Sequence, residues 1–238
     1  MNPKDNFQPA YVIHSRPYRE TSLLVDFLTA NYGRVSVVVR GARRSQKKRS
    51  IYQPFAPMQV TWSGNSQLKT LRNSELAGMS TQLKGKRLYS GLYLNELLYR
   101  LLQPEEPAPA LFAGYMRALG DLAQAADDLS ELASLRRFEL RLLDELGYGV
   151  DYTRDGQTGA VIAANARYGF LLNVGFVADP YQGDIPGHLL AAIAQGNWQT
   201  DQLAILKRVN RSILDSLLGP KPLHSRSLYL ATMPPSST

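Results

Sequence analysis

Val35-Ser-Val-Val-Val39 is followed directly by Arg40-Gly-Ala-Arg-Arg-Ser-Gln-Lys-Lys-Arg-Ser50, and this junction sets the fold of the N-terminal third. The valine run predicts a buried strand. The ten positions from 40 to 49 then carry six cationic side chains, and the prolines of Gln53-Pro-Phe-Ala-Pro57 turn the chain. A dense cationic loop on a small β-rich unit is suited to hold a phosphate backbone, although most charge runs are simply solvated surface.

Short strands are expected on both sides of this junction, because apolar and β-branched residues alternate with turn signals. The predicted strands cover residues 10–15, 22–29, 33–39, 58–62 and 68–73, with Ser63-Gly-Asn-Ser66 as a hairpin loop. A longer excursion separates the third strand from the fourth. This count and spacing favour an OB-fold β-barrel, and an SH3-like barrel fits the pattern nearly as well.

From residue 86 the apolar period changes to three and four residues, which predicts helices. They are expected at 88–102 and 111–126, along the face marked by Leu132 to Leu146, and along the face marked by Leu203 to Leu217. We therefore predict an α+β multidomain chain. Its parts would be an OB-fold nucleic-acid-binding domain at 1–80, a mainly α-helical domain at 81–228 with an irregular segment at about 151–185, and a disordered tail at 229–238.

The charge is concentrated in the first part of the chain. Residues 1–80 hold 12 Lys and Arg against 4 Asp and Glu, a balance of +8, whereas residues 81–238 hold 15 against 16, a balance of −1. This asymmetry indicates a polyanionic partner for the N-terminal third, and nucleic acid fits better than a membrane surface. The chain shows neither a signal-peptide pattern nor an apolar run of about 20 residues, so a cytoplasmic protein without membrane contact is expected. With nucleic acid as its partner, we expect it to be associated with the nucleoid.

Residues able to support catalysis are few. The chain has no cysteine, which excludes disulfides and cysteine-based zinc sites. His14, His188 and His224 stand at no metal-ligand spacing, and neither a phosphate loop nor a nucleophile elbow is present. We expect no catalytic residue, no metal and no cofactor. A hydrolase that uses His14 or His224 with a carboxylate is the weakest alternative.

The cationic side chains of the predicted barrel are the better candidates for a binding site. Arg34 shares the parity of Arg40 on the third strand, opposite the valines that would fill the barrel. Interleaved aromatic residues, Tyr18, Tyr32, Tyr52 and Trp62, could stack on bases or belong to the core. The predicted DNA-binding residues are Arg34, Arg40, Arg43, Arg44, Lys47, Lys48, Arg49, Lys69 and Arg72.

A second basic patch lies on the predicted helices. Arg136, Arg137 and Arg141 flank the apolar face that contains Phe138, and Lys207, Arg208 and Arg211 flank the last helix. These residues could rim an apolar groove for an acidic peptide with an aromatic end. Intrahelical pairing, for example of Arg141 with Glu145, explains them equally well.

Several motifs in a consistent order resemble the bacterial recombination mediator family RecO, of the gammaproteobacterial type. They are Val12-Ile-His-Ser-Arg-Pro-Tyr-Arg-Glu-Thr-Ser-Leu23, Gly33-Arg-Val, Arg40-Gly-Ala-Arg43, Gln53-Pro-Phe55, Leu88-Tyr-Ser-Gly-Leu-Tyr-Leu-Asn-Glu-Leu97, Leu135-Arg-Arg-Phe-Glu-Leu140, Leu146-Gly-Tyr-Gly149 and Lys221-Pro-Leu-His-Ser-Arg226. Each motif is weak alone, but together they run from about residue 10 to 228.

The resemblance implies an OB-fold followed by a helical domain, and a role in recombinational DNA repair. It implies binding of single- and double-stranded DNA, annealing of complementary strands, contact with the acidic C-terminal tail of single-stranded-DNA-binding protein (SSB), and cooperation with RecR in loading RecA. The implied SSB-tail site matches Arg136, with Arg137, Phe138 and Arg141 beside it. The alternative is an OB-fold RNA-binding protein acting in translation or RNA processing.

The chain departs from the family pattern at one place. Many RecO proteins carry a four-cysteine zinc site after the Gly-Tyr-Gly motif, but Asp151-Tyr-Thr-Arg-Asp-Gly-Gln-Thr-Gly159 and the residues that follow contain no cysteine. We therefore expect packing, rather than a metal, to hold this loop.

Overall fold

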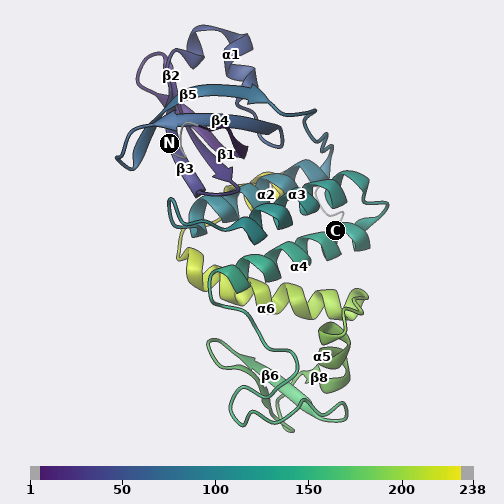
Figure 1. Ribbon diagram of the computed structural model, residues 1–238. Helices are drawn as coiled ribbons and strands as arrows, with labels where there is room; N and C mark the ends of the chain where they lie inside the picture. Colours follow the sequence, from purple (N-terminus) through teal and green to yellow (C-terminus); the bar gives the residue numbers. More distant parts are fainter. Residues whose placement is uncertain (1–5, 232–238) are drawn as a thin grey trace. The chain divides into compact units, whose positions relative to one another are not determined.

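The computed structural model describes residues 6–231, which form two compact units (Figure 1). The first unit combines the chain up to Gln124 with the residues from Lys221 onward, and the second comprises Ala125–Pro220. This division differs from the predicted boundary at residue 80, because two helices after the barrel, and one near the C-terminus, pack in the first unit. Of the predicted tail, residues 229–231 belong to a helix, and residues 232–238 lie outside the described residues.

Five strands close into a barrel in the first unit, in the order β1-β2-β3-β5-β4 with β4 returning to β1. All pairs are antiparallel except β3 with β5. A 3₁₀ turn (η2) and a short helix (α1) fill the excursion between β3 and β4. The predicted OB-fold is confirmed by this topology, which also decides against the SH3-like alternative. The bounds are β1 Gln8–Tyr18, β2 Ser22–Thr29, β3 Gly33–Val39, η2 Ala42–Arg44, α1 Gln46–Ile51, β4 Pro57–Ser63 and β5 Leu68–Leu76.

The alternate valine side chains of β3 fill the interior of the barrel, as predicted. Val35, Val37 and Val39 are at most 6% exposed, whereas the residues between them are half-buried. Burying each of these side chains stabilises the fold by about 1.5–3 kcal/mol. The barrel core is completed by Ala10, Val12, Leu23, Val25, Phe27, Ala42, Tyr52, Met58, Val60 and Trp62.

Two helices, α2 (Lys86–Leu101) and α3 (Pro109–Gln124), pack against the barrel. Tyr11 of β1 is enclosed by aromatic rings of α3, with its ring centroid 5.3 Å from that of Tyr115 and 5.8 Å from that of Phe112. At Gly91 in α2 an added Cβ would lie 2.9 Å from the ring of Phe55, so only glycine allows this close approach. In Figure 1, α1 lies at one end of the barrel and α2 and α3 at the other.

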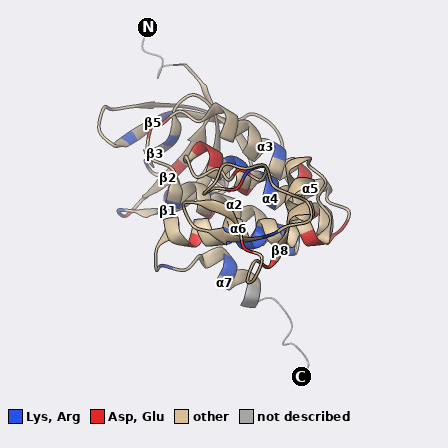
Figure 2. Cartoon of the chain, turned by 90° about the horizontal axis from the view of Figure 1, so that it is seen from below, with Lys and Arg blue, Asp and Glu red and all other residues tan. Residues whose placement is uncertain are grey.

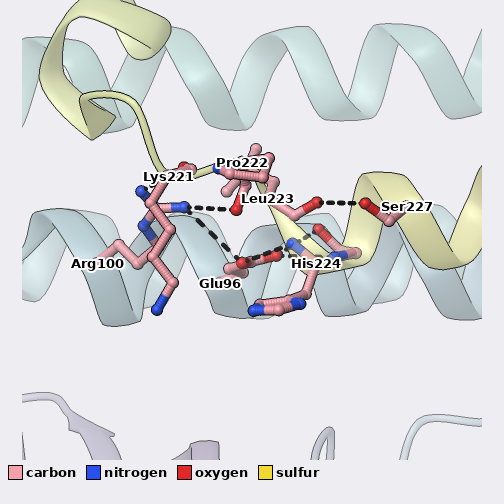
Figure 3. A network of polar contacts seen from close by, with 8 residues as sticks. Glu96, Arg100, Lys221, Pro222, Leu223, His224 and Ser227 are labelled. Atoms are coloured by element: carbon pink, nitrogen blue, oxygen red, sulfur yellow. Dashed lines mark hydrogen bonds and ion pairs between the residues drawn. The ribbon is translucent and has the colours of Figure 1, made fainter.

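The last described helix, α7 (His224–Ala231), is fastened to α2 by two charged side chains (Figure 3). The Glu96 carboxylate accepts hydrogen bonds from the backbone N–H groups of His224 and Ser225, both at 2.9 Å. These bonds hold the pKa of Glu96 below its ordinary value, although its partial burial opposes the shift. Arg100, one turn later, donates to the carbonyl oxygens of Lys221 and Pro222. The returning chain is therefore anchored to the first unit.

The second unit pairs two long helices and adds a small sheet. A capping box between Asp127 and Ser130 starts the first of them, α4. The side chain of Asn210, in α6, donates to the buried carboxylate of Glu139, in α4, at 3.0 Å. The sheet has the order β7-β6-β8 and occupies part of the segment predicted to be irregular. The bounds are α4 Asp128–Glu145, β6 Arg167–Leu171, β7 Gly175–Ala178, β8 Ile185–Pro186, α5 Gly187–Ala194 and α6 Thr200–Leu218.

A carboxylate organises the loop that has no cysteines. Asp155 is 4% exposed and accepts hydrogen bonds from the backbone N–H groups of Gln157, Thr158 and Ala178, at 3.0, 2.8 and 2.7 Å. The bonds from Thr158 and Ala178 lower the pKa of Asp155 most strongly. A buried hydrogen-bonded anion, in addition to packing, therefore orders this segment.

Within residues 6–231 no helix is long and apolar enough to span a bilayer.

Candidate nucleic-acid interface

The cationic stretch folds back onto the turn between β1 and β2. Gly41 takes a left-handed conformation with φ of 66°, which redirects the chain after β3. The backbone N–H of Arg43 then donates to the carbonyl of Thr21 at 2.9 Å. Its guanidinium donates to the carbonyls of Arg19 and Glu20, both at 3.1 Å. Arg43 therefore braces the β1–β2 turn, and the DNA contact predicted for this exposed residue stays a prediction.

An open groove of about 900 Å³ lies between this turn, the end of β3 and the start of β5. Among the side chains that the structure describes, four cations line it besides the paired Lys69, namely Arg19, Arg40, Arg44 and Lys48. Glu20 is the one carboxylate among these described lining residues. The OB-fold binds oligonucleotides through its β1–β2 and β4–β5 loops and the adjoining strand face, and this groove adjoins the first of these loops and the strand that follows the second.

The charges of the groove are available to a ligand. Arg40, Arg44 and Lys48 are exposed, and none of them forms an ion pair with any described side chain. Arg49, also on α1, is exposed but does not line the groove. Uncompensated like charges around one concavity attract a polyanion and raise its local concentration. The groove is therefore the strongest candidate interface in the first unit.

Lys69 is predicted above as a DNA contact, but its placement argues against that role. It is 2% exposed, and its Nζ lies 2.5 Å from Glu105 Oε1 and 2.6 Å from the carbonyl oxygen of Ser66. A buried ammonium needs such partners because desolvation is costly. Lys69 thus connects β5 to the loop after α2, and its charge is already compensated.

Arg34 has a similar structural role. Its guanidinium lies 3.5 Å from the buried Asp26 carboxylate, donates to the carbonyl of Leu102 at 3.1 Å, and lies over the Tyr99 ring. Since these contacts occupy the side chain, Arg34 is a poor candidate for phosphate binding.

One other predicted contact, Arg72, does not line the groove. Arg72 is exposed, and its Nε donates to Ser63 Oγ at 2.7 Å across the β4–β5 hairpin. The side chain of Lys47 lies outside the described residues. The groove therefore brings together Arg40, Arg44 and Lys48 from the predicted set.

Sequence reasoning missed Arg19, which follows the last residue of β1. Its backbone φ is 49°, unusual for a residue with a side chain, and its guanidinium lies 5.3 Å from the centre of the Tyr18 ring. An arginine in a short turn that closes a hairpin is the signal that could have identified it, because the first hairpin loop of an OB-fold borders the ligand face.

The histidines serve structural contacts. The His14 ring stacks on Tyr99 with centroids 4.3 Å apart, and burial lowers its pKa although Asp26 opposes the shift. The backbone N–H of His224, the first residue of α7, donates a hydrogen bond to the Glu96 carboxylate. In the described part of the chain, no group of three or more His, Asp or Glu residues could hold a metal ion.

The predicted peptide site on α4 divides into buried and exposed residues. Arg136 is 6% exposed and pairs with Glu139 at 2.9 Å, and Phe138 is 2% exposed. Arg137 and Arg141 are exposed, with the Arg137 guanidinium 5.7 Å from the centre of the Trp198 ring. The exposed pair could meet an acidic ligand, whereas Arg136 and Phe138 belong to the packed interior.

Two of the three basic residues of α6, Arg208 and Arg211, are paired with acids, and the third, Lys207, is exposed. Arg211 lies 3.2 Å from Asp215, and Arg208 pairs with Asp184. Acidic and basic residues both occur along α4 and α6 (Figure 2). The helices of the second unit thus lack the single-sign character of the groove.

Comparison with known proteins agrees with this architecture. The family model described as "Recombination protein O N terminal" matches residues 5–79, and the one described as "Recombination protein O C terminal" matches residues 82–227. A "DNA repair protein RecO" from Pseudoalteromonas atlantica is 44% identical over 229 residues, which cover 93% of each chain. Proteins of the same name from Photobacterium profundum and Vibrio cholerae are 41% and 40% identical, with 95% and 97% of this chain covered and 96% of each relative.

Two family models that together match most of the chain place it in a class of two-part recombination proteins that begin with an OB-fold. The chain belongs to the RecO family. The resemblance inferred from the ordered motifs is confirmed, and the two family models divide the chain close to residue 80.

Proposed function

We propose that this chain is a recombination mediator that binds single- and double-stranded DNA through the barrel groove and anneals complementary strands. Family membership gives it a role in DNA repair. The observation that carries the proposal is the groove, where Arg19, Arg40, Arg44 and Lys48 face one Glu20. Phosphate neutralisation by such side chains supplies most of sequence-independent affinity for nucleic acid.

Annealing requires two polyanions to approach each other. Cations held around the groove would neutralise phosphates of one strand, and the exposed Arg49 on the same helix as Lys48 extends the positive charge beyond the groove. A second strand would then meet a reduced negative potential. No chemical step is needed, because lowering the repulsion accelerates pairing.

We further propose that the helical region engages the acidic tail of SSB, and that the protein acts with RecR in loading RecA. Arg137 and Arg141 are the exposed arginines of α4, and a guanidinium suits a carboxylate-rich peptide. Replacing both with Ala should weaken binding of an SSB-tail peptide without loss of helix content. Arg136→Ala should instead lower the melting temperature, since it removes the partner of the buried Glu139. Equal peptide affinity in wild type and the double variant would remove these two arginines from the site.

Annealing of complementary strands coated with cognate SSB tests the DNA-annealing and SSB-tail parts of the proposal together. Wild type should accelerate annealing, and the acceleration should vanish when SSB lacks its acidic tail. Arg44→Gln with Lys48→Gln should abolish most of the acceleration. The matched control is Arg117→Gln with Lys84→Gln, which removes the same charge from exposed positions outside the groove.

Failure of wild type to accelerate annealing would contradict the proposal. Tighter binding to RNA than to DNA of the same sequence, with no affinity for the SSB tail, would favour an RNA-binding role instead.

A further inference from the structure

We propose that Tyr18 is a base-stacking residue and that it makes the groove prefer unpaired strands to duplex. This inference rests on the proposed function, because it assumes that the groove holds nucleic acid. It concerns a different property, since the cations attract any phosphate backbone whereas an aromatic face distinguishes unstacked bases from stacked ones.

The structure separates Tyr18 from the other aromatic residues near the cationic stretch. Trp62 is 1% exposed and Tyr32 packs edge-on against it, with centroids 5.4 Å apart. Tyr52 is 7% exposed, and its hydroxyl lies 2.8 Å from Ser74 Oγ. Trp62 and Tyr52 belong to the barrel core, and Tyr32 is partly buried against that core and does not line the groove. Tyr18 is half-buried and lines the groove.

The Tyr18 ring is carried by a well-supported element. Tyr18 ends β1 and is paired with Ser22 of β2 across the turn. Arg43 fixes the carbonyls of the two turn residues that follow it, Arg19 and Glu20. A stacking surface held in this way loses little conformational freedom when a ligand arrives, which favours binding.

The guanidinium of Arg19 now lies over this ring, 5.3 Å from its centre. A cation–π contact at an exposed site is weaker than the stacking of a base on an aromatic ring. A base can therefore take the place of the guanidinium over the ring, which releases Arg19 to meet a neighbouring phosphate. Tyr18 and Arg19 would act together on one nucleotide.

The uncharged residues of the groove are consistent with binding that does not depend on sequence. Besides Tyr18, the groove is lined by Val38, Gly41 and Leu68, which have no polar side-chain atom, and by Thr21, Ser22 and Thr70. The three hydroxyl groups can each donate or accept, so they do not distinguish one base edge from another. In a duplex both faces of each base are already stacked within the helix, so the Tyr18 ring gains no base contact there. Selection for single strands follows without recognition of particular bases.

Tyr18→Ala in the full-length chain tests the inference, with dissociation constants for a labelled oligo(dT) and for a duplex of equal length measured by fluorescence anisotropy. We expect single-strand affinity to fall about tenfold, the loss of one stacked base, and duplex affinity to change less than about twofold. Tyr18→Phe should retain wild-type values. Tyr148→Ala, at an exposed tyrosine of the second unit, is the matched control and should change neither affinity.

If Tyr18→Ala unfolds, Tyr18→Leu keeps an apolar side chain of similar bulk without the flat ring, and it should show the same selective loss. Equal losses for single strand and duplex, or no loss for either, would overturn the stacking role. The proposed function fails separately: if Arg44→Gln with Lys48→Gln leaves both affinities unchanged, the groove does not bind DNA. If that double variant binds weakly while Tyr18→Ala matches wild type, only the stacking inference fails.

Discussion

Neutralising two groove cations should flatten the salt dependence of DNA binding by a calculable amount. Each phosphate contact on a single strand contributes about −0.7 to the slope of log K against log salt. Contacts from Arg19, Arg40, Arg44 and Lys48 would give a slope of about −2.8, and the Arg44→Gln, Lys48→Gln variant would keep about −1.4. Between 50 and 200 mM salt, affinity should thus fall about 50-fold for wild type and about sevenfold for the variant.

The assay is a series of anisotropy titrations of oligo(dT) at four or more salt concentrations. The Arg117→Gln, Lys84→Gln control has the same net charge as the groove variant, so it should keep the wild-type slope if binding is local. Equal slopes in wild type and groove variant would refute the assignment of phosphate contacts to Arg44 and Lys48. Equal flattening in the control would show that net charge, and not the groove, governs binding.

Three further predictions concern residues with structural roles. Lys69→Met should lower the free energy of unfolding in urea by about 1–3 kcal/mol, since it removes the hydrogen bonds to Glu105 and Ser66. Its affinity for oligo(dT) should stay within about twofold of wild type. A large loss of affinity without loss of stability would show that Lys69 belongs to the interface. Gly33→Ala should cost about 2–5 kcal/mol, because φ is 58° and the new Cβ would lie 1.8 Å from the Glu106 carbonyl oxygen. Gly41→Ala, with φ of 66°, ψ of 12° and the nearest atom 3.7 Å from the new Cβ, should cost about 1–2 kcal/mol. Equal costs in urea unfolding would contradict the clash. Asp155→Asn should weaken hydrogen-exchange protection of the Gln157, Thr158 and Ala178 amides. Because the pKa of Asp155 is lowered in the folded protein, wild-type protection should be complete above the ordinary Asp pKa of 3.8 and should be lost as pH falls through the lower folded pKa. A wild-type protection profile that does not change with pH would exclude this linkage.

The barrel could be predicted from sequence because its signals are local. Period-two alternation such as Val35, Val37 and Val39 reports which side of a strand is buried, and the long excursion after Val39 separates β3 from β4. The helix positions followed from apolar spacing in the same way. The division into compact units did not follow, because the anchoring of residues 221–231 to Glu96 and Arg100 joins parts of the chain over 120 residues apart.

The candidate site was predicted in part. The exposed cations Arg40, Arg44 and Lys48 lie in one continuous stretch and needed no tertiary information. Lys69 and Arg34 could not be sorted from them, because their partners Glu105 and Leu102 come from a loop that only the fold brings near. Parity along a strand or helix does not reveal whether a cation is already paired.

The burial of Arg136 on α4 could not be predicted from the sequence for a related reason. Arg136 flanks the apolar stripe that contains Phe138, and the amphipathic pattern does not tell whether an arginine beside such a stripe is covered. In the structure the Arg136 guanidinium turns to Glu139, three residues later, and is enclosed with it.

Photocrosslinking of single-stranded DNA to the full-length chain tests the central claim most directly. An oligonucleotide containing 4-thiothymidine, bound at low salt and irradiated, would be mapped by mass spectrometry of the crosslinked peptides. We predict crosslinks within residues 18–22, 38–48 and 68–70, which border the groove, and their loss in the Arg44→Gln, Lys48→Gln variant. Crosslinks confined to residues 125–220 would contradict the claim that the barrel groove is the DNA-binding site.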